Sequence, residues 1–312
     1  MLIVRPVLAV LLAAPLVLAS CSSGTSEQAG TSKPNDAAPC PTTPVDVVVS
    51  VDQWGDVVSE LGGACAKVTT LLASSSVDPH DYEPSPADAA KFEGARLVVV
   101  NGGHYDEWAA KLAAASAPDA PVVNAVELSG GDDHGETNPH VWYQPTAVTG
   151  VADAVTARLT ALAPDAGDYF AERRRAFGSS LGEYDRLIES IKASASGKTY
   201  AATETVFDPM AAALGLQNKT PQGYQNATRN ESDPSPGDLD AFLVLLRDKG
   251  VDVLVYNTQT EGSVPEQLRS AAEAAGVPVV EVTETVAPGA ESFEAWQVNQ
   301  LSSLSKALGV AG

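Results

Sequence analysis

Four side chains that could bind a metal ion follow predicted strands at four separate places in the sequence. They are two imidazoles and two carboxylates: His80, His140, Glu204 and Glu284. Imidazole nitrogen suits zinc, copper, iron and nickel, and carboxylate oxygen shifts the preference towards manganese or iron. The combination predicts a site for one divalent transition ion, although each residue taken alone is more often an ordinary surface residue.

The two histidines share a local motif, because His80 lies in Asp-Pro-His and His140 lies in Asn-Pro-His. Proline fixes its own φ angle and restricts the residue before it, so it stiffens the backbone that leads to each imidazole. A stiffened approach lowers the entropy cost of holding a ligand in place. The repeated motif therefore favours metal ligation by both residues.

The segments that must position these four residues alternate between strands and helices. Short runs rich in β-branched residues alternate with amphipathic helical stretches. The runs predict strands at 45–51, 67–73, 96–101, 121–126, 198–204, 251–257 and 277–283. This alternation predicts βαβ units and parallel sheets. In such sheets ligands gather beyond the carboxyl ends of the strands, which is where the four candidate residues are expected.

One long helical stretch, 165–195, interrupts the alternation. Its length of roughly 30 residues is well above the mean of ~11–12 for globular helices. We therefore predict an α/β fold of two Rossmann-like lobes with parallel sheets, an N-terminal lobe over 45–164 and a C-terminal lobe over 196–312, joined by this one long rigid helix. Each lobe supplies two candidate ligands, so all four should meet in a cleft between the lobes. The longest loop of the second lobe is predicted over 219–236.

The first twenty residues have the organisation of a targeting segment. Arg5 supplies a positive charge, and 7–19 is an apolar run of 13 residues, too short for a helix that spans a bilayer, which needs ~20. The ending Leu-Ala-Ser-Cys resembles a bacterial lipobox, which implies that Cys21 is lipidated; an ordinary secretory signal is the alternative. We predict a lipoprotein signal peptide over 1–20, a flexible polar tether over 21–44, and a lipid-anchored protein on the extracytoplasmic face of the cell membrane.

The chain is strongly acidic, with a formal net charge of −21. Nucleic-acid binding needs clustered Lys and Arg, so this charge argues against a nucleic-acid partner. It suits the attraction of cations, although a solvated acidic surface also serves solubility alone.

Three cysteines are present, and assigning Cys21 to lipid leaves Cys40 and Cys65 as an even pair. Cys40 precedes the first predicted strand and Cys65 precedes the second. In an oxidising compartment such a pair is either a disulfide across neighbouring strands or two free thiols.

The motifs around the candidate ligands resemble those of the zinc- and manganese-binding solute-binding proteins of ABC importers, the cluster A-I family, over roughly 45–308. The segment DPHDYEPSPADAAKFEGARLVVVNGGHYDEWAAKL, with His80, resembles the first metal-ligand motif, and NPHVWYQP, with His140, the second. TETVFDPMAAALGL resembles the third, with Glu204 as ligand and Phe207 as its aromatic. VTETVAPG resembles the fourth, where Glu284 replaces the usual aspartate.

The resemblance implies a non-catalytic protein that captures a metal ion outside the cytoplasm. It would deliver the ion, as a monomer, to an ABC permease and its ATPase. Two His and two carboxylates resemble the manganese-type branch more than the zinc-type branch, which usually supplies a third His. The transported ligand is thus expected to be Mn²⁺, slightly favoured over Zn²⁺. Among the remaining residues, Trp142 and Tyr143 should pack around the site, and His104 is expected to be a non-ligand. His134 is expected in a solvated loop, with a weak auxiliary contact to a cation as the alternative.

Other functions fit the sequence less well. A metal-binding surface lipoprotein acting as an adhesin or sensor would use the same ligands. A metallohydrolase would need an open coordination position and a general base, and the sequence contains no His-Glu-X-X-His. A glycosidase built on Glu204 and Glu284 would leave both histidines unexplained. We therefore do not expect an enzyme.

Overall fold

The computed structural model describes residues 39–73, 80, 82–130, 137–230, 232–260 and 262–310. The predicted signal peptide, the lipidation site Cys21 and His134 lie outside the described residues. Within these ranges, no helix has the length and apolar character needed to cross a membrane.

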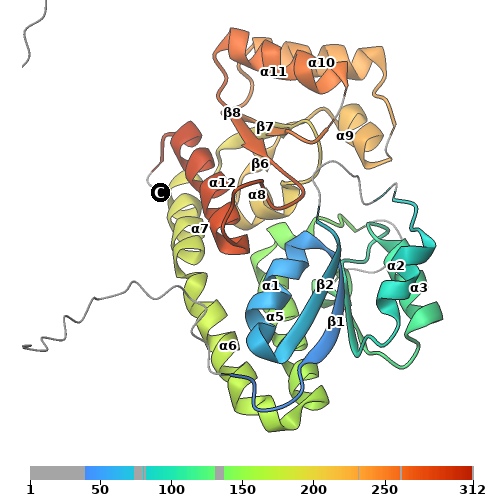
Figure 1. Ribbon diagram of the computed structural model, residues 1–312. Helices are drawn as coiled ribbons and strands as arrows, with labels where there is room; N and C mark the ends of the chain where they lie inside the picture. Colours follow the sequence, from blue (N-terminus) through green and yellow to red (C-terminus); the bar gives the residue numbers. More distant parts are fainter. Residues whose placement is uncertain are drawn as a thin grey trace, which may run out of the picture. The chain divides into compact units, whose positions relative to one another are not determined.

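The first half of the described chain is built on a parallel sheet with strand order β2-β1-β3-β4. Its strands are β1 (Val45–Val51), β2 (Ala66–Leu72), β3 (Leu97–Val100) and β4 (Val122–Asn124). Helices α1 (Asp52–Gly62) and α5 (Pro145–Leu162) cover one face of the sheet, and α2 (Pro86–Phe92) and α3 (Glu107–Ser116) lie on the other (Figure 1). Covered on both faces, β3 is buried at every position, which explains its unbroken Leu-Val-Val-Val sequence.

The second half is built on a parallel sheet with strand order β6-β5-β7-β8. Its strands are β5 (Thr199–Ala202), β6 (Gln217–Asn218), β7 (Val253–Asn257) and β8 (Val279–Val282). Helices α8 (Asp208–Leu214) and α12 (Phe293–Leu308) pack on one side, and α10 (Pro236–Arg247) and α11 (Ser263–Ala275) on the other (Figure 1). Along β7 the side chains alternate: Val253 and Val255 join the large core shared with the first half, whereas Leu254 joins a smaller core under α10 and α11.

A long helix connects the two sheets, as predicted, but it is bent. It consists of α6 (Gly167–Ser180) and α7 (Gly182–Ala195), which meet at Leu181. The 3₁₀ turn η3 (Pro164–Ala166) precedes α6. The bend falls in the run Gly-Ser-Ser-Leu-Gly at 178–182, where glycine and serine weaken the helix. Helix α6 packs against α1 and α5, and α7 packs against α8 and α12, so the connection lies along both halves (Figure 1).

The prediction of a loop over 219–236 is wrong, because this segment contains α9 (Gln222–Arg229). Its sequence, QGYQNATR, is polar, and Tyr224 is the one buried residue. The Tyr224 ring lies 4.9 Å from that of Phe242, and its hydroxyl donates to the carbonyl of Thr203 at 3.2 Å. A single aromatic anchor holds this helix, so no repeating apolar pattern marks it in the sequence.

The remaining elements are short. They are α4 (Ala125–Leu128) and the 3₁₀ helices η1 (Gly63–Cys65) and η2 (Val141–Tyr143). Cys65, at the end of η1, forms a disulfide with Cys40, with Cα atoms 5.0 Å apart. The bond ties the segment before β1 to the start of β2.

Candidate metal centre

The structure brings the four predicted side chains together at the carboxyl ends of both sheets. His80 follows β2, His140 precedes η2, and Glu204 and Glu284 lie two residues after β5 and β8. The two imidazole rings are 6.3 Å apart between centroids, and His140 Nε2 is 3.6 Å from Glu284 Oε1. Asn257, the last residue of β7, donates from Nδ2 to Glu204 Oε2 at 2.5 Å and to Glu284 Oε1 at 3.4 Å, so one amide bridges the two carboxylates.

The four side chains lie near one another, but their ligand atoms are too far apart for all four to coordinate one ion. Two ligand atoms ~2.1 Å from an ion at a tetrahedral angle lie ~3.4 Å apart, which is close to the spacing of His140 and Glu284. Within the described parts of the chain, only Asp56, Glu60 and Glu294 form a trio whose ligand atoms all lie within 4.8 Å of one another. No three of the four predicted ligands therefore reach that spacing, and an ion bound by all four would draw them closer.

The orientation of His140 is fixed by its neighbour Asn138. The Asn138 amide donates to the carbonyl of Thr205 at 2.8 Å, and a carbonyl can only accept, so the side-chain oxygen of Asn138 must face the other way. That oxygen accepts from the backbone N–H of His140 at 3.0 Å and lies 2.7 Å from His140 Nδ1. In neutral imidazole, Nδ1 therefore carries the proton and Nε2 keeps a lone pair.

His140 Nε2 is buried and makes no hydrogen bond within the described structure. Its 3.6 Å separation from Glu284 Oε1 is too long for a hydrogen bond. A buried polar atom without a partner is costly and rare in folded proteins. This lone pair, held towards a carboxylate, has the geometry of a metal ligand.

Glutamines from both halves of the chain hold the backbone of Glu284. Gln53, in the first turn of α1, donates to the Glu284 carbonyl at 2.8 Å. Gln259, just after β7, accepts from the Glu284 N–H at 2.6 Å and from the Thr285 N–H at 3.0 Å. The Glu284 carboxylate in turn accepts from the Tyr105 hydroxyl at 3.4 Å. Few degrees of freedom remain for this side chain.

The two carboxylates differ in their affinity for protons. Burial raises the pKa of Glu204, and the adjacent charge of Glu284 raises it further. Burial also acts to raise the pKa of Glu284, but its interactions with the protonated forms of His140 and His80 and with the Tyr105 hydroxyl outweigh it, so its pKa lies below the ordinary value. Two carboxylates in one partly buried site favour a cation, which would relieve their mutual repulsion.

Aromatic rings enclose the imidazoles. Trp142 and Tyr143 are fully buried. Trp142 packs against His140, as predicted, with the two rings nearly perpendicular and their centroids 5.2 Å apart. The Tyr143 hydroxyl donates to the carbonyl of Thr283, one residue before Glu284, at 2.7 Å. The rings of Tyr105 and His80 lie 4.8 Å apart, edge to face. These contacts restrict the rotation of both histidines.

His104, which is expected to be a non-ligand, lies within the described residues. It is half-exposed and forms an ion-pair contact with Glu107. The sequence reasoning missed the supporting residues Gln53, Tyr105, Asn257 and Gln259. The rule that selected Glu204 also applies to three of them, because Gln53, Asn257 and Gln259 all lie at or just beyond the carboxyl end of a strand.

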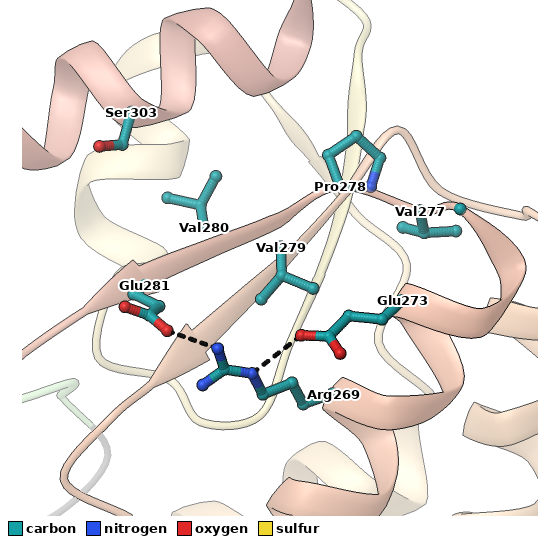
Figure 2. Close-up of a pocket in the computed structure, with 9 residues that line it drawn as sticks. Arg269, Glu273, Val277, Pro278, Val279, Val280, Glu281 and Ser303 are labelled. Atoms are coloured by element: carbon teal, nitrogen blue, oxygen red, sulfur yellow. Dashed lines mark hydrogen bonds and ion pairs between the residues drawn. The ribbon is translucent and has the colours of Figure 1, made fainter.

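A cavity of about 580 Å³ lies apart from these residues, along the outer edge of β8 between α11 and α12. Figure 2 shows Arg269 between Glu273 and Glu281, with nitrogen–oxygen distances of 3.1 and 2.8 Å. Both carboxylates pair with the one guanidinium, so the cavity offers no free cation to an anionic ligand, and its excess negative charge belongs to glutamates that Arg269 already engages. We assign no function to it.

The chain has two parallel sheets joined by a long bent helix, and polar side chains at the strand ends of both sheets face one another. This is the architecture of a solute-binding protein. The chain belongs to the family described as zinc-uptake complex component A, periplasmic, whose model matches residues 47–307. The members of this family are metal-binding solute-binding proteins of ABC transporters, of the zinc or manganese type, and are non-catalytic. The predicted family, fold class and metal-uptake function are confirmed.

Individual relatives differ in the metal that they are named for. The chain is 25% identical to the high-affinity zinc uptake system protein ZnuA of Bacillus subtilis (strain 168), over 64% of this chain and 67% of that protein. It is 23% identical to the manganese ABC transporter substrate-binding lipoprotein PsaA of Streptococcus pneumoniae, over 88% of this chain and 87% of that protein. The solved structure of the periplasmic zinc-binding protein TroA from Treponema pallidum shares the fold, with a TM-score of 0.71 at 20% identity, over 86% of this chain and 99% of that chain.

Proposed function

We propose that His80, His140, Glu204 and Glu284 together bind one divalent transition ion, which the protein then delivers to the permease of an ABC importer and its ATPase. The observation that carries this proposal is the buried Nε2 of His140, which makes no hydrogen bond within the described part of the chain and is held 3.6 Å from Glu284 Oε1 by the contact of Asn138 with the opposite ring nitrogen. An ion in this position would satisfy the lone pair, whose desolvation otherwise costs about 1–3 kcal/mol.

Binding is proposed to draw the ligands together. The halves of the chain, as lobes over 45–164 and 196–312, would close slightly along the helix that spans both, with the bend at Leu181 between them. The His140–Glu284 pair already has a spacing suited to one ion. Most of the movement is therefore required of His80 and Glu204, the other two ligands.

The proposed ion is Mn²⁺, slightly ahead of Zn²⁺. The site offers two nitrogen and two carboxylate ligands, and carboxylate suits manganese better than a third imidazole would. Intrinsic affinities follow the Irving–Williams order, in which Zn²⁺ binds more tightly than Mn²⁺ at most such sites. Selection of manganese would then depend on the supply of each metal outside the cytoplasm as much as on affinity.

The site of action is proposed to be the extracytoplasmic face of the cell membrane. Relatives are named as lipoproteins, and the sequence ending Leu-Ala-Ser-Cys at Cys21 supports the same anchor here. An anchored monomer on a polar tether would remain close to its permease while it samples the surrounding solution.

Competition titration of the metal-free protein against a chromogenic chelator, with Mn²⁺ and with Zn²⁺, tests the ligand assignment. Replacing His80 or Glu204 by alanine should each weaken binding well over tenfold, because each removes one of four ligands. Glu172→Gln, an exposed substitution on α6, serves as the control and should bind like the wild type. Full affinity in both alanine variants would refute the assignment.

A further inference from the structure

We infer that Gln53 is a positioning residue for metal binding: its amide, from the first half of the chain, fixes the Glu284 ligand that the second half supplies. The inference rests on the proposed function, because it concerns the geometry of one of the proposed ligands. Gln53 is a neutral side chain that would not itself touch the ion.

The position of Gln53 is firmly set. It is the second residue of α1 and follows β1, an interior strand of the first sheet. Its side chain is fully buried, with 0% of its surface exposed. From there Nε2 lies 2.8 Å from the Glu284 carbonyl oxygen and 3.1 Å from the Tyr105 hydroxyl. The Gln53 amide therefore contacts the backbone of Glu284 directly and the carboxylate of Glu284 through Tyr105.

The direction of these hydrogen bonds follows from what each atom can do. A carbonyl oxygen only accepts, so the nitrogen of the Gln53 amide must face Glu284. The second N–H of that nitrogen then donates to the Tyr105 oxygen, which leaves the Tyr105 proton for Glu284 Oε2, 3.4 Å away. The opposite atom, Gln53 Oε1, is buried and makes no hydrogen bond within the described structure. The amide thus keeps this orientation although its oxygen is left unsatisfied.

The bond from Gln53 to Glu284 differs from the other contacts that hold this ligand backbone. Gln259 lies in the same half as Glu284, so it can only position the ligand relative to the second sheet. Gln53 is 231 residues away in sequence and lies in α1 of the first half, which also carries both histidines. It therefore sets the distance between the carboxylate and the two imidazoles, which is the distance that an ion must match.

The test compares metal binding by the full-length mature protein with and without this amide. Gln53→Met keeps the length of the side chain and removes both donors. Its affinity for Mn²⁺ and Zn²⁺, measured by chelator competition, should fall about 10- to 100-fold, as for other residues that orient a metal ligand. Gln53→Asn keeps the amide on a side chain that is one methylene shorter. If Gln53→Met does not fold, Gln53→Asn takes its place and should also weaken metal binding.

Gln297→Met is the matched control. Gln297 is also 0% exposed, and neither of its amide atoms makes a hydrogen bond within the described structure, so its substitution removes a buried amide and none of the hydrogen bonds that hold the ligands. The melting temperature of Gln297→Met measures how much stability is lost when a buried amide is removed. The metal affinity of this variant should equal that of the wild type. Equal affinities of Gln53→Met and Gln297→Met would overturn the inference.

A double-mutant cycle separates positioning from a general defect. In a Glu284→Ala background the carboxylate that Gln53 positions is gone, so adding Gln53→Met should change the affinity less than twofold. An undiminished 10- to 100-fold loss in that background would overturn the inference, because Gln53 would then act on something other than Glu284. A wild-type protein that binds neither Mn²⁺ nor Zn²⁺ would instead refute the proposed function itself.

Discussion

Replacing Glu60 by glutamine should stabilise the metal-free protein at pH 8 and leave its stability at pH 4 unchanged. Glu60 and Asp56 on α1 and Glu294 on α12 have carboxylate oxygens within 4.8 Å of one another, at the contact between the two halves. Burial, followed by the charges of Glu294 and Asp56, raises the pKa of Glu60 to about 7, and Arg173 offsets this only in part.

The magnitude follows from proton linkage. The folded protein binds this proton more tightly than the unfolded chain, whose glutamate has a pKa of 4.5. The free energy of unfolding therefore falls as the pH rises from about 4.5 to about 7 and is unaffected by this group outside that window. The upper bound is about 3.4 kcal/mol, at 1.36 kcal/mol for each tenfold change in proton affinity. Glu60 is partly exposed, so screening by solvent reduces the expected effect to about 1–2 kcal/mol.

Urea denaturation at pH 4, 6 and 8, in the presence of a chelator, measures the effect directly. The difference between Glu60→Gln and the wild type should grow from near zero at pH 4 to about 1–2 kcal/mol at pH 8. Glu172→Gln, on the exposed surface of α6, should show no such trend. A difference that is constant across this range, or a variant less stable than the wild type at pH 8, would refute the reasoning.

Three further predictions concern the ion, the motion and the disulfide. Protein purified from its native envelope should contain Mn²⁺ in excess over Zn²⁺ by elemental analysis, while Zn²⁺ should displace Mn²⁺ in competition at equal concentrations; zinc as the native ion would contradict the first part. The radius of gyration should change by less than about 1 Å on metal binding, because the connecting helix packs on both halves; a wide closure in small-angle scattering would exclude this. Replacing Cys40 and Cys65 by serine should lower the free energy of unfolding by about 3.5 kcal/mol, from the loop entropy of a separation of 25 residues, and should leave metal affinity within twofold of the wild type.

The sequence predicted most of the fold because the two halves follow ordinary patterns. Valine-rich runs bounded by glycine and proline became strands within a few residues of the predicted bounds, as with Val45–Val51. The failures occurred where a local pattern was absent. A single buried tyrosine, Tyr224, anchors α9, and the bend at Leu181 depends on glycine and serine residues that a helix can also accommodate.

The site was predictable only in part, for a related reason. His80, His140, Glu204 and Glu284 stand out because metal-ligating residue types recur after four separate predicted strands, although each residue alone would be ordinary. Gln53 and Asn257 are neutral amides, which are frequent in loops and helices alike. Their roles depend on contacts across the sheets, such as the 231-residue separation between Gln53 and Glu284, and no local pattern encodes such a contact.

The two sheets share one hydrophobic core. Valines of β1 and β3 belong to the same buried cluster as Val253, Val280 and Leu301 of the second half. Neither half can therefore be separated from the other without exposing apolar surface to water. Calorimetry of the metal-free protein should show a single cooperative transition, and either half expressed alone should aggregate. The continuous core also makes large separations of the halves energetically expensive, so we expect the halves to shift only slightly when an ion enters or leaves.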